Sequence, residues 1–145
     1  MTAETAQPVS PAAMSQSDEQ VWATLAHLSV LINLFTGFLG PVVALIIYLI
    51  FANRSRYVAY HALQAFLFQL LVWCGLGAMW GLVGILSAVL VGIVLIPLAC
   101  VLTPFFLVGM AIAPLYGVWG AIQTSQGRDF DYWLVGGWVR GPLNR

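Results

Sequence analysis

The feature that most constrains this chain is a stretch of 71 residues, from Tyr57 to Gly127, that contains no Asp, Glu, Lys or Arg. A membrane helix needs only about 20 apolar residues, so this stretch is long enough for more than one crossing. Only 7% of the 145 residues are charged and 61% are hydrophobic, whereas a soluble domain carries about 25% charged residues. These values predict an integral membrane protein and exclude a soluble enzyme or a disordered chain. The zero net charge, with no basic patch, excludes nucleic acid as a partner.

The apolar stretches have the pattern of helices. Residues 44–51 and 88–96 lack the alternation of apolar and polar positions that marks the strands of a membrane barrel. Backbone groups in lipid must pair internally, and a helix does this within one segment. The expected fold class is all-α: an integral membrane helical bundle of four helical segments, the first two short, at about residues 20–36, 41–54, 58–95 and 103–125.

The chain divides into three parts by composition. Residues 1–16 contain Pro, Ala, Ser and Thr without apolar periodicity, so a flexible N-terminal tail is expected there. Residues 17–127 form the expected helical membrane domain, and residues 128–145 are expected to be a polar C-terminal tail. Ser17 and Gln20 have the spacing of a capping box, which predicts that the first helix begins at Ser17.

Two breaks within the membrane domain leave alternatives open. Gly40-Pro41 favours a hairpin of two short helices, because proline removes a backbone donor and restricts the residue before it. A kink there would instead give one long tilted helix and place the N-terminus on the opposite side from Arg54. In the second block, Pro97 and Pro104 are expected to bracket the turn between two long helices, and three shorter spans are the alternative.

The arginines predict the orientation. All five basic residues are arginines, with Arg54 and Arg56 in one short loop and the other three in the C-terminal tail. Positive charge is retained on the cytoplasmic side of membrane proteins. We therefore expect a multi-pass protein of the bacterial plasma (inner) membrane, with the Arg54/Arg56 loop and the C-terminus in the cytoplasm.

Five uncharged polar residues within the apolar segments are candidates for a functional face. His61 and Gln64 share one helical face with Gln69 at its edge, and His27 and Asn33 lie on the first segment. Polar side chains at such positions face other helices, where they hydrogen-bond across the bundle. The expected role is helix contact, and the alternative is the lining of a polar path.

The chain lacks recognisable catalytic and ligand-binding motifs. It has no phosphate loop, nucleophile elbow or paired-cysteine motif, and Cys74 and Cys100 are single cysteines in apolar surroundings. His27 and His61 lack a third ligand for a metal site. We therefore expect no enzyme activity, no cofactor and no metal.

Small residues recur at four-residue spacing on two of the expected helices. Such stripes allow helix backbones to approach closely in lipid. They predict helix packing, within one chain or between chains, through Gly109, Ala113, Gly117 and Ala121 on the last helix, and through Gly77 and Gly81 on the preceding one.

Several sequence pieces also resemble a known family. Residues 18–29 (DEQVWATLAHLS), 37–41 (GFLGP), 61–69 (HALQAFLFQ) and 117–123 (GVWGAIQ), followed by Asp131-Tyr132-Trp133, resemble a family of small bacterial multi-pass membrane proteins of unknown function. That family looks related to the channel component of the chloroplast inner-envelope protein translocon (Tic), a four-helix protein with both ends on one side. The resemblance favours the hairpin at Gly40-Pro41 and brings no catalytic residues with it.

These observations lead to one functional hypothesis and one alternative. The hypothesis is a non-enzymatic membrane protein that acts through helix association, as a translocation-related component or as an accessory subunit of a membrane assembly. Its expected partners are the lipid bilayer and other membrane protein subunits or further copies of itself. The alternative is a small oligomeric transporter or channel.

Overall fold

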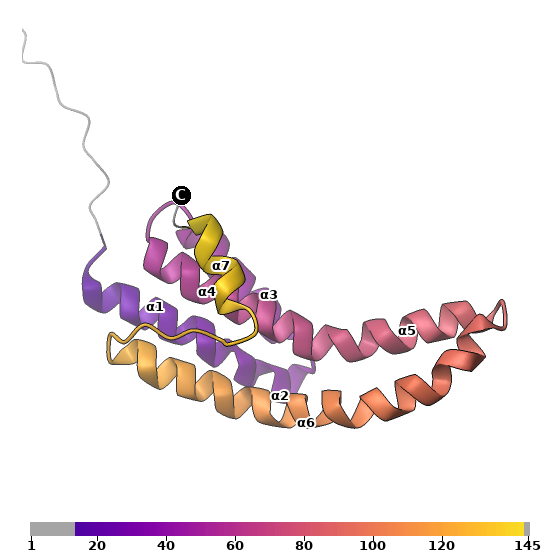
Figure 1. The fold of residues 1–145 in the computed structure, drawn as a ribbon. Coiled ribbons are helices and arrows are strands. Elements are labelled where there is room, and N and C mark those ends of the chain that lie inside the picture. Colours follow the sequence, from indigo (N-terminus) through magenta and orange to yellow (C-terminus); the bar gives the residue numbers. More distant parts are fainter. Residues whose placement is uncertain (1–13, 144–145) are drawn as a thin grey trace, which may run out of the picture.

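The computed structural model describes residues 14–143, and its N-terminal part is a helical hairpin (Figure 1). Helix α1 (Gln16–Leu28) continues through a 3-10 turn (Ser29–Ile32) into the short helix α2 (Asn33–Thr36), and α3 (Leu39–Phe51) then runs back beside them. Gly37, between α2 and α3, has a φ of +79°, a conformation that favours glycine. The predicted hairpin is therefore present, with its turn at residues 37–38.

The ends of the first helices follow local chemistry. The Ser15 side chain accepts a hydrogen bond from the Asp18 N–H at 3.2 Å and caps α1. The prediction of Ser17 as the cap was therefore wrong, because Ser17 lies in the first turn of α1. Pro41 is in the first turn of α3, where its missing N–H has no partner to lose.

Two long helical segments follow the hairpin. Ser55 caps the first segment by accepting a hydrogen bond from the Val58 N–H at 3.1 Å. This segment runs without interruption through three helical pieces: α4 (Arg56–Gln69), a π-helical turn (Leu70–Cys74) and α5 (Gly75–Ser87). The second segment is the single 35-residue helix α6 (Val91–Ser125).

The turn between the long helices is not where the prolines predicted it. The chain reverses at residues 88–90, where Leu90 has a φ of +65°. Pro97 and Pro104 lie inside α6, so the prediction that they bracket the turn was wrong. Proline is tolerated inside membrane helices, because local adjustments and neighbouring groups satisfy the freed backbone carbonyls. Gly92 allows the tight reversal, since a Cβ there would collide with the Val83 carbonyl and with Ser87.

The long helices extend beyond the hairpin and divide the molecule into two regions. We call residues 75–108 the arm, which comprises α5 and the first half of α6. We call the remaining described residues the bundle. Figure 1 shows the arm projecting past the α2–α3 turn, whereas the second half of α6 packs against α1.

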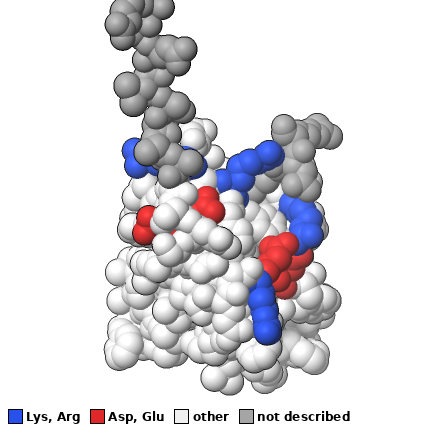
Figure 2. Space-filling view, turned by 90° about the vertical axis from the view of Figure 1, so that its left-hand side faces the viewer, with Lys and Arg blue, Asp and Glu red and all other residues white. Residues whose placement is uncertain are grey.

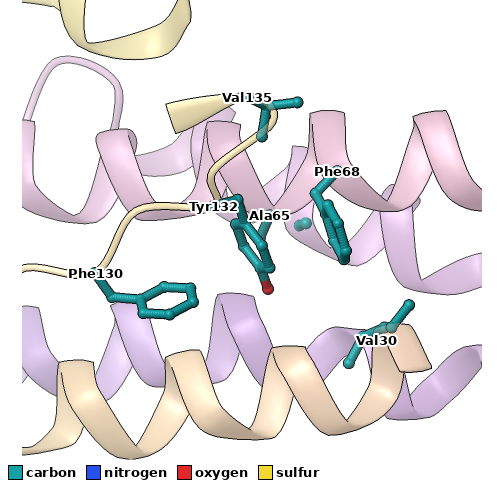
Figure 3. Packing of buried hydrophobic residues seen from close by; sticks show 8 residues of the cluster. Val30, Ala65, Phe68, Phe130, Tyr132 and Val135 are labelled. Carbon is teal, nitrogen blue, oxygen red and sulfur yellow. The ribbon is translucent and has the colours of Figure 1, made fainter. Parts of the chain in front are cut away.

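The chain after α6 returns through the bundle. Phe130 and Tyr132 are buried, and Tyr132 stacks on Phe68 of α4 with ring centroids 4.3 Å apart. Figure 3 shows this segment passing between the helices, with Tyr132 directed into the core. Helix α7 (Gly136–Leu143) follows and packs on α4. Residues 130, 132, 135 and 139, which belong to the part expected as a polar tail, are thus buried in the bundle.

The structure confirms the all-helical fold class with four main segments, because the described residues contain helices and no strand. Residues 56–87 and α6 are long and apolar enough to cross a membrane. At about 1.5 Å per residue, 32 and 35 residues give roughly 50 Å each. This exceeds the ~30 Å hydrocarbon core of a bilayer, so a crossing helix must tilt or protrude.

Candidate functional site

The candidate site is a network of buried polar side chains at the centre of the bundle. His27 of α1 and His61 of α4 are both fully buried, and their rings meet with Nε2 of His27 3.2 Å from Nδ1 of His61. On its other side, Nδ1 of His27 lies 3.1 Å from the Tyr132 hydroxyl. The pair therefore joins α1, α4 and the returning C-terminal segment.

Gln64 fixes the C-terminal segment to α4. Its Oε1 accepts a hydrogen bond from the Tyr132 N–H at 3.1 Å, and its Nε2 donates to the Phe130 carbonyl at 2.6 Å. The same Nε2 lies 3.0 Å from Nδ1 of His61. The two backbone partners determine which way the amide points, so its nitrogen is the donor toward His61.

This orientation assigns the protons on the histidines. Because Nδ1 of His61 accepts from Gln64, it carries no proton, and His27 donates to it through Nε2–H. Nδ1 of His27 is then the acceptor for the Tyr132 hydroxyl. The proton of His61 is on Nε2, which has no hydrogen-bond partner among the described residues and lies 3.9 Å from Oδ1 of Asp129. Both rings are neutral in this arrangement.

A second buried group ties the hairpin to α4. Nδ2 of Asn33 donates to Oε1 of Gln69 at 3.1 Å, and Nε2 of Gln69 donates to the Ser29 hydroxyl at 2.9 Å. Oδ1 of Asn33 accepts from the Gly40 N–H at 2.7 Å. A Cβ on Gly40 would collide with Gln69, Ser29 and Asn33, so only glycine allows α3 to approach this closely.

A charged cluster that was not predicted from the sequence covers the outer side of the histidine pair. Arg140 of α7 donates to Asp129 at 2.9 Å and to Asp131 at 2.6 Å, and its guanidinium lies 5.5 Å from the centre of the Tyr60 ring. Tyr60 also donates to Asp131. Hydrogen bonds to Tyr60 and Asp131 raise the pKa of Arg140, which stays charged. The cluster thus anchors α7 and the returning segment to α4.

Tyr132 is a second buried member of the site that the sequence did not predict. Burial raises the pKa of its hydroxyl well above the usual value, which keeps the group neutral and able to donate to His27. The available signal was the period of two in residues 129–133, where Phe130 and Tyr132 are buried between three exposed neighbours. That pattern is typical of an extended segment with one face against a core.

The small residues of α6 lie against α1. Ala113 and Ala121 are 1% and 2% exposed, and a Cβ on Gly117 would lie 2.5 Å from Cγ1 of Val30 and 3.2 Å from the His27 carbonyl. Gly109 is packed more loosely, because a Cβ there would lie 3.9 Å from Cγ1 of Val72 and within 4 Å of no other side chain in the described residues.

The glycines of α5 are placed differently. A Cβ on Gly77 or Gly81 would meet nothing within 4 Å, so neither residue packs against the described part of this chain. Cys74 and Cys100 are free thiols, and no group of three or more potential metal ligands occurs among residues 14–143.

The fold and the site together define a helical membrane protein whose buried polar groups hold its own segments together. Residues 18–139 match the magnetosome magnetite crystal formation protein family (MamF/MmsF), and the chain belongs to that family. No curated protein and no solved structure matches it. The family match supports the predicted resemblance to small bacterial membrane proteins and gives no evidence for a relation to Tic.

Proposed function

We propose that the chain is a non-enzymatic accessory protein of the magnetosome membrane that acts in magnetite crystal formation by associating with other membrane proteins. The family match carries this proposal, because it covers both the bundle and the arm. The placement of the polar residues supports it. His27, His61, Gln64 and Gln69 are all fully buried, and their hydrogen bonds go to other parts of the same chain.

The same burial favours association over transport. A transporter or channel needs polar side chains along a water-filled path, and these side chains are packed between helices instead. A translocation-related role rests on the sequence resemblance alone and is not part of the proposal. The open glycine face of α5, at Gly77 and Gly81, is the surface that we assign to association, since small residues let a second helix approach closely.

Deletion and complementation in a magnetite-forming bacterium that encodes this chain test the proposal. We expect the deletion to change the size or number of the magnetite crystals in electron micrographs, and the wild-type gene to restore them. Gly81→Leu should insert normally but restore them poorly, because it fills the association face. Ala111→Leu introduces the same side chain at an exposed position of the bundle and should restore them fully. Unchanged crystals after deletion would contradict the proposal.

The proposed orientation places the charged end of the bundle in the cytoplasm. Figure 2 shows acidic and basic side chains gathered at the end where α1 begins and α6 ends. The turn after α3 and the start of the C-terminal segment are both at this end, which fits the retention of positive charge on the cytoplasmic side. In a variant lacking the native cysteines, a cysteine at Asn53 and one at Gln126 should react with a membrane-impermeant reagent only from the cytoplasmic side. Reaction from the other side would show that the orientation is the opposite of the proposed one.

A further inference from the structure

An apolar groove of about 460 Å³ runs between α1 and α3 on the outside of the bundle. Its lining is apolar apart from Ser29, whose hydroxyl is bonded to the Ala26 carbonyl. Leu25, Ile46 and Ile50 line it with 44%, 49% and 47% of their surfaces exposed. A groove of this kind within a membrane protein must be filled by something apolar, because water would leave these side chains unfavourably hydrated.

One end of the groove lies at the charged end of the bundle. Trp22 and Ile50 line this end, and the Trp22 ring packs on Phe51 with centroids 4.9 Å apart. Tryptophan is enriched at the level of the lipid headgroups. The end of the groove that Trp22 marks is therefore at the membrane interface, and the groove extends from there toward the hydrocarbon.

A cation without a protein partner lies just beyond this end. Arg54 is exposed, four residues after Ile50 in the turn that follows α3, and no acidic side chain among residues 14–143 forms a salt bridge with it. Glu19, beside the same turn, accepts a hydrogen bond from Ser55 at 2.6 Å. Arg140, in contrast, is paired with both Asp129 and Asp131.

We propose that the groove binds one acyl chain of an anionic phospholipid whose phosphate contacts Arg54. The occupant must be apolar along its length and negatively charged at the interfacial end, and an anionic phospholipid has both properties. A second copy of this chain fits less well. Two of its four described acidic residues are already paired with Arg140, and its two long helical segments carry no acid at all.

Native mass spectrometry of the purified full chain in a mild detergent tests this proposal. Phosphatidylglycerol and phosphatidylcholine with identical acyl chains are titrated, and the wild type should bind phosphatidylglycerol more tightly. Arg54→Gln should weaken phosphatidylglycerol about fivefold, the effect of one arginine beside an anionic surface. It should weaken phosphatidylcholine much less, because the choline cation offsets the charge of the same phosphate. Ile46→Trp, which fills the groove, should weaken both lipids.

Two matched variants are the controls. Arg128→Gln removes another exposed arginine away from the groove, and Val42→Trp enlarges an exposed residue of α3 that does not line it. Both should bind the two lipids as the wild type does. Equal wild-type affinities for the two lipids, equal effects of Arg54→Gln and Arg128→Gln, or unchanged binding by Ile46→Trp would each overturn the proposal. A change of oligomeric mass in Ile46→Trp, with lipid binding intact, would assign the groove to a second copy and overturn it too.

Discussion

The bundle and the arm share the same two long helical segments but are stabilised in different ways. In the bundle, two buried polar groups connect α1, α3, α4 and the C-terminal segment. In the arm, one inter-helix side-chain hydrogen bond is present among the described residues, from Trp80 to Thr103 at 2.9 Å. The rest of the arm surface is apolar, and residues such as Ile85 and Val94 are 74% and 78% exposed.

This difference indicates that the two regions have different roles: the bundle has a specified structure, and the arm offers a surface. Apolar packing gives little preference for one helix arrangement over another in lipid, since the lipid tails are as apolar as the side chains. Buried hydrogen bonds restrict the partners, because each unpaired polar group costs free energy. The bundle is thus specified by its own sequence, whereas the arm presents apolar helix faces to lipid or to other proteins.

The largest expected effect is at the centre of the bundle. Gln64→Leu removes the partners of the Phe130 carbonyl and the Tyr132 N–H, both of which stay buried, and leaves Nδ1 of His61 with His27 as its remaining donor. At about 1–3 kcal/mol for each unpaired group, we expect the free energy of unfolding to fall by about 2 kcal/mol or more. Thermal unfolding in detergent measures the loss. Leu82→Gln makes the reverse change at an exposed arm position, and a stability loss as large as that of Gln64→Leu would refute the contrast.

The second largest loss of stability is expected when a glycine of the bundle, but not one of the arm, is replaced by leucine. Gly117→Leu forces a large side chain against Val30 and the α1 backbone, and overpacking of this kind costs about 1–3 kcal/mol. Gly81→Leu adds the same side chain in open space and should leave the stability of the purified chain within about 0.5 kcal/mol of wild type. Size-exclusion chromatography after heating distinguishes the two. Equal losses would mean that the arm is also packed in the purified protein.

Much of this contrast was predictable from the sequence. The apolar runs predicted the helices, and the period of the polar residues placed His61 and Gln64 on one buried face. The sequence did not reveal the partners of that face, because they belong to a segment more than 60 residues away. This segment carries the charges of Arg128, Asp129 and Asp131, so the sequence predicts a polar tail that includes its two inward aromatic residues. The turn was predicted at the wrong place because proline, which lowers helix stability in water, is tolerated inside a helix in lipid.

Acid should weaken the bundle and spare the arm. The histidine pair is neutral in the folded chain, and protonation of Nδ1 of either ring would remove an acceptor from the network. Below about pH 6.5, unfolded histidine takes up a proton that the folded pair does not hold, so stability falls as the pH falls. The loss is up to about 1.4 kcal/mol per pH unit for each histidine.

Unfolding of the wild type and of His61→Gln at several pH values measures this slope. The glutamine amide can accept a hydrogen bond but does not titrate, so the variant should show a shallower dependence on pH. The charged groups that face the pair are Asp129, Asp131 and Arg140. Asp129→Asn should therefore carry the loss of stability to a lower pH, because it removes the carboxylate nearest to His61 Nε2 that could stabilise a protonated ring. Identical slopes in the wild type and His61→Gln would show that His61 does not titrate on unfolding.

The smallest effect is expected in the arm. Thr103→Val removes the acceptor of the Trp80 indole while it keeps the size of the side chain. Hydrogen bonds between membrane helices contribute about 0.6 kcal/mol on average, because the separated helices find other partners, so we expect a loss of that order. Ser87→Ala is the control, since its hydroxyl bonds only to the Val83 carbonyl of its own helix. Both variants are compared with wild type by unfolding in detergent. If Thr103→Val cost as much as Gln64→Leu, the arm would depend on a specific polar contact in the same way as the bundle, and the division of the molecule into a specified region and a permissive one would be wrong.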